Sequence, residues 1–126
     1  MGQLLKKAIK FAYEKHGKQE RKYDGLPYIT HPVDVMNILK VATDDEEILA
    51  AAVLHDVMED CNVPFEEMVK EFGGRVATIV RMLTKPDNKG LAKSKEALMI
   101  KCADVIHNIS DAPNWYVQKK VKDIWA

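Results

Sequence analysis

The sequence predicts an all-α protein, a compact bundle of several helices. Apolar residues recur at three- and four-residue spacing along most of the chain, helix start and stop signals separate these stretches, and no stretch alternates apolar and polar residues as a strand would. With 126 residues the chain is long enough to bury one helical core without disulfides or structural zinc. We therefore expect a single domain over residues 1–126.

The first half of the chain predicts three helices. The first ends at Gly17, and after a polar loop Pro32 suits the first turn of the second, so that His31 opens this helix. Residues 43–46 form a capping box for the third, which contains the run ILAAAVLHDVMED. Because the middle of this run is almost wholly apolar, we expect one continuous helix in the centre of the domain.

The second half predicts four more helices. Two of them, FEEMVKEF and RVATIVRMLT, are separated by glycines. Ser94 can cap the next helix, KEALMIKCADVIHNIS, and a last helix is expected from about Asn114. We expect the apolar face of the KEALMIKCADVIHNIS helix to be formed by four residues about one turn apart: Leu98, Cys102, Val105 and Ile109.

Composition excludes several classes of partner. Lys and Arg total 19, as do Asp and Glu, so no global basic field favours nucleic acid. No apolar run approaches the ~20 residues of a membrane span, and the N-terminal segment has helical periodicity instead of a signal-peptide pattern. The two cysteines, Cys61 and Cys102, form no zinc pattern and are expected to be small buried apolar residues. We expect a soluble, cytoplasmic protein.

The run LHDVMED, residues 54–60, is the most informative stretch for function. It places four ionisable residues in the most apolar predicted helix, and at roughly 100° per residue they would lie within an arc of about 140°. These residues are His55, Asp56, Glu59 and Asp60. Burying carboxylates beside histidines is costly unless a cation or hydrogen-bond partners compensate, so the run predicts a metal site.

Two further residues complete a four-ligand set. His31 opens the preceding helix and Asp104 lies in a later apolar helix, so the order along the chain is H…HD…D. Two imidazoles and two carboxylates leave positions open on a six-coordinate ion, and this mixed ligation suits manganese, with iron, cobalt, zinc or magnesium as competitors. The alternative is a structural polar cluster, which would leave buried charge uncompensated.

Three segments contain these ligands and their flanking residues: HGKQERKYDGLPYITHPVDVMNIL, LAAAVLHDVMEDCNVPFEEMVKEFGGRVATIVRMLTK and KCADVIHN. Together they resemble the HD superfamily of phosphohydrolases, in particular the hydrolase domain of the RelA/SpoT alarmone enzymes and their small single-domain relatives. The resemblance extends from about Leu4 to Asp111. It implies an all-α HD-domain bundle that hydrolyses the 3′-diphosphate of guanosine tetra- or pentaphosphate (ppGpp or pppGpp) to GDP or GTP and pyrophosphate, as in the stringent response.

The resemblance also implies roles for individual residues. It makes His31, His55, Asp56 and Asp104 the manganese ligands. It makes Glu59 and Asp60 the acidic pair that orients and deprotonates a water, although both could instead support the histidines. Arg21 and Lys22 would hold the guanine base, and Asn108 would face the sugar or a phosphate. His107 is expected to be structural.

The sequence departs from the family pattern before and after Asp104. Val105 and Ser110 stand where the family usually has a cation, and the stretch before Asp104 is shorter than in typical members. Replacement phosphate contacts could come from four lysines of that stretch: Lys85, Lys89, Lys93 and Lys95. Two alternatives to an alarmone hydrolase therefore remain: an HD phosphatase for another nucleotide, and a catalytically silent nucleotide-binding module. The oligomeric state is open.

Overall fold

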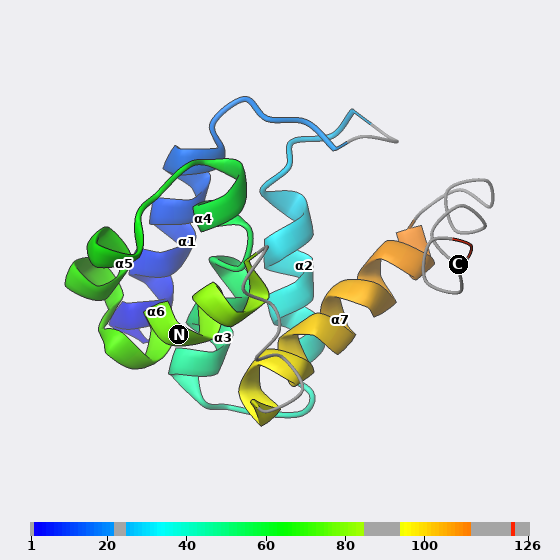
Figure 1. The fold of residues 1–126 in the computed structure, drawn as a ribbon. Helices are drawn as coiled ribbons and strands as arrows, with labels where there is room; N and C mark the ends of the chain where they lie inside the picture. Colours follow the sequence, from blue (N-terminus) through cyan, green and yellow to red (C-terminus); the bar gives the residue numbers. More distant parts are fainter. Residues whose placement is uncertain (1, 22–24, 85–93, 112–121, 123–126) are drawn as a thin grey trace.

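The computed structural model describes residues 2–21, 25–84, 94–111 and 122 (Figure 1). Within these residues the elements are helices, joined by turns and by one isolated bridge between Glu20 and Pro27. The helices are α1 Gln3–His16, α2 Thr30–Leu39, α3 Glu46–Val53, α4 Val57–Asp60, α5 Phe65–Phe72, α6 Gly74–Leu83 and α7 Lys95–Asp111. The prediction of an all-α bundle is confirmed.

Helix α3 lies at the centre of the bundle, as its apolar sequence predicted. It contacts α1, α2, α6 and α7, and every residue from position 48 to position 53 is buried. Figure 1 shows α7 crossing beside α2, and these two helices are in extensive contact. The core therefore joins helices from both ends of the described chain around α3.

Local signals set most helix ends where the sequence placed them. Gly17 follows α1 with a φ of 53°, a left-handed conformation that glycine adopts without strain. The Ser94 hydroxyl accepts a hydrogen bond from the backbone N–H of Ala97 at 3.1 Å, as expected of a cap. The cap of α3 is Asp45, whose side chain accepts from two backbone N–H groups, whereas Thr43 only accepts from the Asp45 N–H.

The prediction of one continuous helix through LHDVMED is wrong. Helix α3 ends at Val53, and His55 and Asp56 lie in a turn before α4. The Nδ1 atom of His55 lies 2.7 Å from the carbonyl oxygen of Ala52, so the imidazole takes an acceptor that the next helical turn would use. His55 and Asp56 therefore do not share one helix with Glu59 and Asp60, and the arc of about 140° expected of an unbroken helix is not formed.

The apolar face predicted for α7 is also wrong. Leu98, Val105 and Ile109 are 46%, 37% and 56% exposed, and Cys102 is exposed as well. The buried face comprises Ala97, Ile100, Ala103, Asp104 and His107. The polar residues Asp104 and His107 point inward on this helix. A prediction based on hydrophobicity alone therefore chose the wrong face.

Some expectations fall outside the described residues. These are the lysines at positions 85, 89 and 93, the helix expected from Asn114, and Lys22. Lys95 is exposed in the first turn of α7. Among the described helices, none combines the length and the apolar character needed to cross a membrane.

Candidate metal centre

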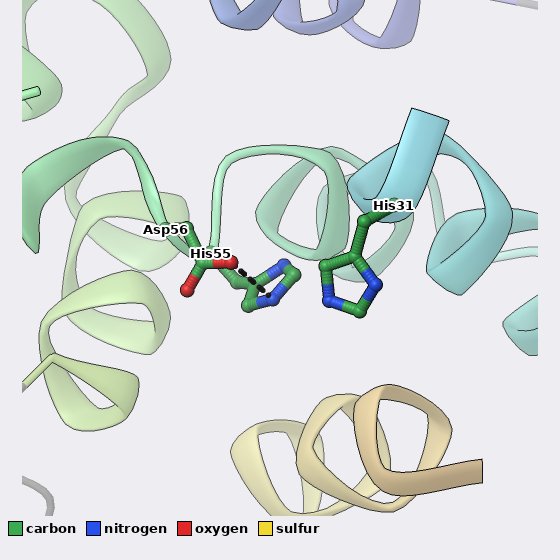
Figure 2. Close-up of side chains that lie close together, drawn as sticks. All are labelled: His31, His55 and Asp56. Atoms are coloured by element: carbon green, nitrogen blue, oxygen red, sulfur yellow. Dashed lines mark ion pairs between the residues drawn. The ribbon is translucent and has the colours of Figure 1, made fainter. Parts of the chain in front are cut away.

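The four predicted ligands come from three parts of the fold. His31 lies in the first turn of α2, His55 and Asp56 form the turn between α3 and α4, and Asp104 lies in the middle of α7. Figure 2 shows the two imidazoles and Asp56 close together between these elements. One ligand atom from each of His31, His55 and Asp56 lies within 4.8 Å of the others.

Asp104 joins the two histidines. Its Oδ1 lies 2.6 Å from His31 Nε2 and 3.3 Å from His55 Nε2. On the other side, His55 Nε2 lies 3.0 Å from Asp56 Oδ2. The structure thus brings all four predicted ligands together, and both imidazoles present Nε2 to the carboxylates.

The group is buried and electrostatically coupled. Burial alone would raise the pKa of Asp56, but the nearby His55 and the Tyr28 hydroxyl lower it to about 2. Burial would likewise raise the pKa of Asp104, but the hydrogen bond with His31 and the nearby His55 bring it well below the usual range. Burial disfavours a charged His55, but the two carboxylates outweigh this effect and raise its pKa. The carboxylates therefore stay ionised and attract positive charge to this point.

The donor set fits a divalent cation. Ala52 offers His55 Nδ1 a carbonyl, which can only accept, so Nδ1 carries a hydrogen and Nε2 is the atom left for a ligand bond. His55 Nε2 is fully buried, and although it lies at ion-pair distance from two carboxylates it makes no directed hydrogen bond. A cation would satisfy this nitrogen and both carboxylates together.

Sequence reasoning missed Tyr28, which supports Asp56. The Tyr28 hydroxyl donates a hydrogen bond to Asp56 Oδ2. Burial, followed by the charge of Asp56, raises the pKa of Tyr28, so this group remains a hydroxyl donor. The available signal was its position three residues before His31, which places Tyr28 in the turn that leads into α2.

His107, expected to be structural, contacts a predicted ligand directly. It lies one turn beyond Asp104 on α7 and is 5% exposed. Its Nδ1 lies 2.8 Å from His31 Nδ1, and its Nε2 lies 3.0 Å from Asp34 Oδ2. The spacing of three residues from Asp104 could have indicated that both face the same neighbour.

The predicted acidic pair lies beside the centre. Glu59 and Asp60 are exposed on α4, one turn beyond Asp56. Gln19 donates its side-chain amide to Asp60 Oδ2 at 3.2 Å and lies 3.0 Å from His16 Nδ1 through its own carbonyl oxygen. The position of Asp60 is therefore tied to the end of α1, and both acids remain open to solvent.

The predicted substrate contacts are placed unequally. The Arg21 side chain is buried at 5% exposure, in the loop before α2, where its backbone N–H donates to Leu26. Asn108 is half-buried on α7, one turn beyond Asp104. Lys101, which sequence reasoning did not select, brings Nζ to 3.4 Å from Asp104 Oδ2 while its side chain stays half-exposed.

Comparison with known families identifies the fold. The HD domain profile matches residues 8–98, a range that contains His31, His55 and Asp56. This chain belongs to the HD domain family. The matched range ends before Asp104, so the family match does not include the fourth predicted ligand of this HD-domain chain.

Two proteins named as 3′-pyrophosphohydrolases are similar to this chain in sequence. The zebrafish (Danio rerio) protein "Guanosine-3′,5′-bis(diphosphate) 3′-pyrophosphohydrolase MESH1" is 38% identical over 146 aligned positions, which cover 98% of this chain and 80% of the relative. The Aquifex aeolicus guanosine-3′,5′-bis(diphosphate) 3′-pyrophosphohydrolase is 46% identical over 81 residues, covering 64% of this chain and 12% of that longer protein. The resemblance to the RelA/SpoT group is confirmed. Because 146 positions exceed the 126 residues here, the zebrafish alignment contains gaps in this chain.

A solved structure supports the same assignment. It is described as "A metazoan ortholog of SpoT hydrolyzes ppGpp and plays a role in starvation responses". It superposes with a TM-score of 0.80 at 35% sequence identity and covers 88% of this chain and 71% of its own. The HD-domain bundle is therefore similar to that of an alarmone hydrolase in both sequence and fold.

Proposed function

We propose that this HD-domain protein is a metal-dependent hydrolase of guanosine 3′,5′-bis(diphosphate) and its pentaphosphate analogue, releasing pyrophosphate and GDP or GTP. The observation that carries the proposal is the convergence of His31, His55, Asp56 and Asp104 in a chain 38% identical to a named 3′-pyrophosphohydrolase. The substrate is a small guanine nucleotide, and we expect no nucleic-acid or membrane partner and a cytoplasmic location.

The four converging residues would hold one divalent cation, with manganese as the favoured ion. Two imidazole nitrogens and two carboxylates suit manganese, and zinc, iron, cobalt or magnesium remain competitors. When bound, the cation would make a water more acidic and polarise a phosphoryl oxygen. Tyr28 would keep Asp56 oriented through its hydroxyl, and the Ala52 carbonyl would keep the His55 ring in place.

The two acids of α4, Glu59 and Asp60, would accept the proton of the attacking water. Glu59 and Asp60 follow Asp56 by one turn and face solvent, where a water can reach them. Gln19 orients one oxygen of Asp60 by donating to it, so the other is free to accept a proton from the attacking water. This arrangement supports a general-base role better than a purely structural one, because neither acid is among the buried groups of the centre.

Substrate recognition would use both sides of the centre. Arg21 and Lys22 would meet the guanine base from the loop before α2, and Asn108 would meet the sugar or a phosphate from α7. Val105 and Ser110, which lack the cations usual in the family, are both exposed on α7. Lys101 offers a cation on the same helix, next to Asp104, where a phosphate could reach it.

One assay tests the proposed function. Purified protein is incubated with ppGpp and with matched guanine and adenine nucleotides, with and without Mn²⁺, and pyrophosphate and orthophosphate are quantified separately. We expect Mn²⁺-dependent release of pyrophosphate from ppGpp, no activity in His55→Ala, and unchanged activity in Asp44→Asn, a change at an exposed carboxylate that bonds none of the centre's residues.

Other outcomes identify the alternatives. Orthophosphate release from a different nucleotide, with ppGpp untouched, would indicate an HD phosphatase of another specificity. Tight ppGpp binding with no product in any metal would indicate a silent nucleotide-binding module.

A further inference from the structure

A chain of three side chains links the candidate metal centre to the outer side of α2. His31 Nδ1 lies 2.8 Å from His107 Nδ1, and His107 Nε2 lies 3.0 Å from Asp34 Oδ2. Both imidazoles are nearly inaccessible to solvent, at 3% and 5% exposed, whereas the Asp34 side chain is 48% exposed. Asp34 follows His31 by three residues on α2. The two side-chain contacts therefore run from α2 to α7 and back to α2.

Helix α7 contacts both nitrogens of the His31 ring. Asp104 lies 2.6 Å from Nε2, and His107 contacts Nδ1. These two residues are separated by three positions and therefore project from the same side of the helix. One helical turn of α7 thus defines the plane and the direction of the His31 imidazole.

When a cation is bound to His31, only one placement of the ring hydrogens on His31 and His107 is favourable. A His31 ring that gives the Nε2 lone pair to a cation keeps its hydrogen on Nδ1 and must donate it to His107 Nδ1. His107 then keeps its own hydrogen on Nε2, where the Asp34 carboxylate accepts it. The opposite tautomer of His107 would turn a lone pair toward the negative Asp34, which is unfavourable.

We infer that Asp34 and His107 are positioning residues for His31, and that they set the metal affinity of the centre by holding the Nδ1–H tautomer of this ligand. The inference rests on the proposed metal centre and adds two residues to it. Histidine ligands commonly donate the second ring N–H to a carboxylate or carbonyl, and losing such a partner typically lowers metal affinity 10- to 100-fold. Here a second histidine is inserted between ligand and carboxylate.

The experiment measures Mn²⁺ binding by titration calorimetry in the 126-residue chain. In His107→Phe the ring volume is retained but the acceptor for His31 Nδ1 is lost, and we expect affinity to fall 10- to 100-fold. In His107→Asn the side-chain carbonyl oxygen can accept that hydrogen, so a substantial part of the affinity should return. In Asp34→Asn we expect a smaller loss, of a few fold, because an amide can still accept from His107.

Controls separate positioning from folding and from bulk charge. Asp44→Asn removes the same charge as Asp34→Asn at an exposed site away from the centre and should bind Mn²⁺ as the parent protein does. Circular dichroism confirms that each variant retains its helical content. Long-range ¹H–¹⁵N spectra of the Zn²⁺-loaded protein report the tautomer directly, and we expect His31 to show a protonated Nδ1 and His107 a protonated Nε2.

Two results would overturn the inference: Mn²⁺ affinity in folded His107→Phe equal to that of the parent, or a His107 ring protonated on Nδ1 in the metal-loaded protein. Neither readout needs substrate. If the protein binds Mn²⁺ but does not hydrolyse ppGpp, the proposed function fails while the positioning inference is still decided by the affinities.

Discussion

The two histidines of the candidate centre are held in different ways. His55 is fixed by its own backbone, through the carbonyl of Ala52 three residues earlier. His31 is fixed by side chains of α7, which lie more than seventy positions away in the sequence. A carbonyl can only accept a hydrogen bond, whereas a histidine can do either, so the first anchor is intrinsic and the second depends on Asp34.

Half of the site is therefore held without contacts from α7. The His55 ring in the α3–α4 turn is held by the Ala52 carbonyl three residues earlier, and Asp56 is supported by Tyr28 from the loop before α2. The contacts that orient His31, and the second carboxylate of the centre, Asp104, come from α7 where it packs against α2. Metal binding should therefore stabilise the docking of α7 on the rest of the bundle.

The largest expected effect comes from breaking the local half of the site. His55→Ala or Asp56→Ala should abolish Mn²⁺ binding and ppGpp hydrolysis while the helical fold persists, because each removes a ligand in the turn without altering a core helix. Metal content after dialysis and pyrophosphate release measure the two losses. Stoichiometric Mn²⁺ in either variant would refute the ligand assignment, and loss of folding would indicate a structural metal.

The next largest effect is expected at the two acids of α4, where a substitution should lower turnover without loss of the metal. Glu59→Gln or Asp60→Asn should keep the metal and lower turnover about 10²- to 10⁴-fold, the usual contribution of a general acid or base. Both acids are exposed on α4 and outside the buried group, so metal content should not change. Near-normal turnover in both amide variants would return these residues to a supporting role.

Base recognition should depend on the loop before α2. Arg21→Ala and Lys22→Ala should lower the specificity constant for guanine nucleotides about 5- to 150-fold, corresponding to ~1 to 3 kcal/mol for a stacked or charge-assisted contact. Mn²⁺ affinity should be unchanged. Because Arg21 is buried, thermal unfolding of its variant must be compared with the parent before the kinetics are interpreted. Equal rates on matched adenine and guanine substrates would contradict base recognition by this loop.

Tyr28 offers a milder test of how Asp56 is held. Tyr28→Phe removes only the hydroxyl that donates to Asp56, and we expect Mn²⁺ affinity to fall about tenfold with little change in stability. Tyr13→Phe is the matched control, because Tyr13 is 64% exposed on α1. A Tyr28→Phe protein with parental affinity would show that Asp56 needs no hydroxyl partner.

The smallest effect is the pH dependence of stability in the metal-free protein. Asp56 and Asp104 have lowered pKa values, so they stabilise the fold above their ordinary value of 3.8, and this stabilisation is lost as pH falls toward 2. His55 has a raised pKa, so its contribution is complete below 6.5 and is lost as pH rises through the raised value. Thermal unfolding in EDTA should therefore show a fall in stability on both sides. Added Mn²⁺ should reverse the alkaline fall, because the metal needs a deprotonated His55 nitrogen.

The fold class and the candidate ligands could be predicted from local sequence patterns. Helical periodicity with caps at Gly17 and Ser94 was sufficient for the bundle, because these signals act within a few residues. The candidate ligands could be selected because burying ionisable residues in apolar helices is costly unless a partner compensates their charge. They are His31, His55, Asp56 and Asp104. The structure brings these four together, and their roles as ligands stay a prediction.

Much of what holds the site depends on contacts between distant parts of the chain. The inward face of α7 depends on which side of the helix meets α2. The break after Val53 accompanies a local contact, between the His55 ring and the Ala52 carbonyl, that the apolar pattern did not reveal. Periodicity selected the more hydrophobic face of α7, but packing buried the face that carries Asp104 and His107. Contacts such as Tyr28 with Asp56 and His107 with His31 join residues far apart in sequence, and local pattern carries no information about which distant side chains will become neighbours.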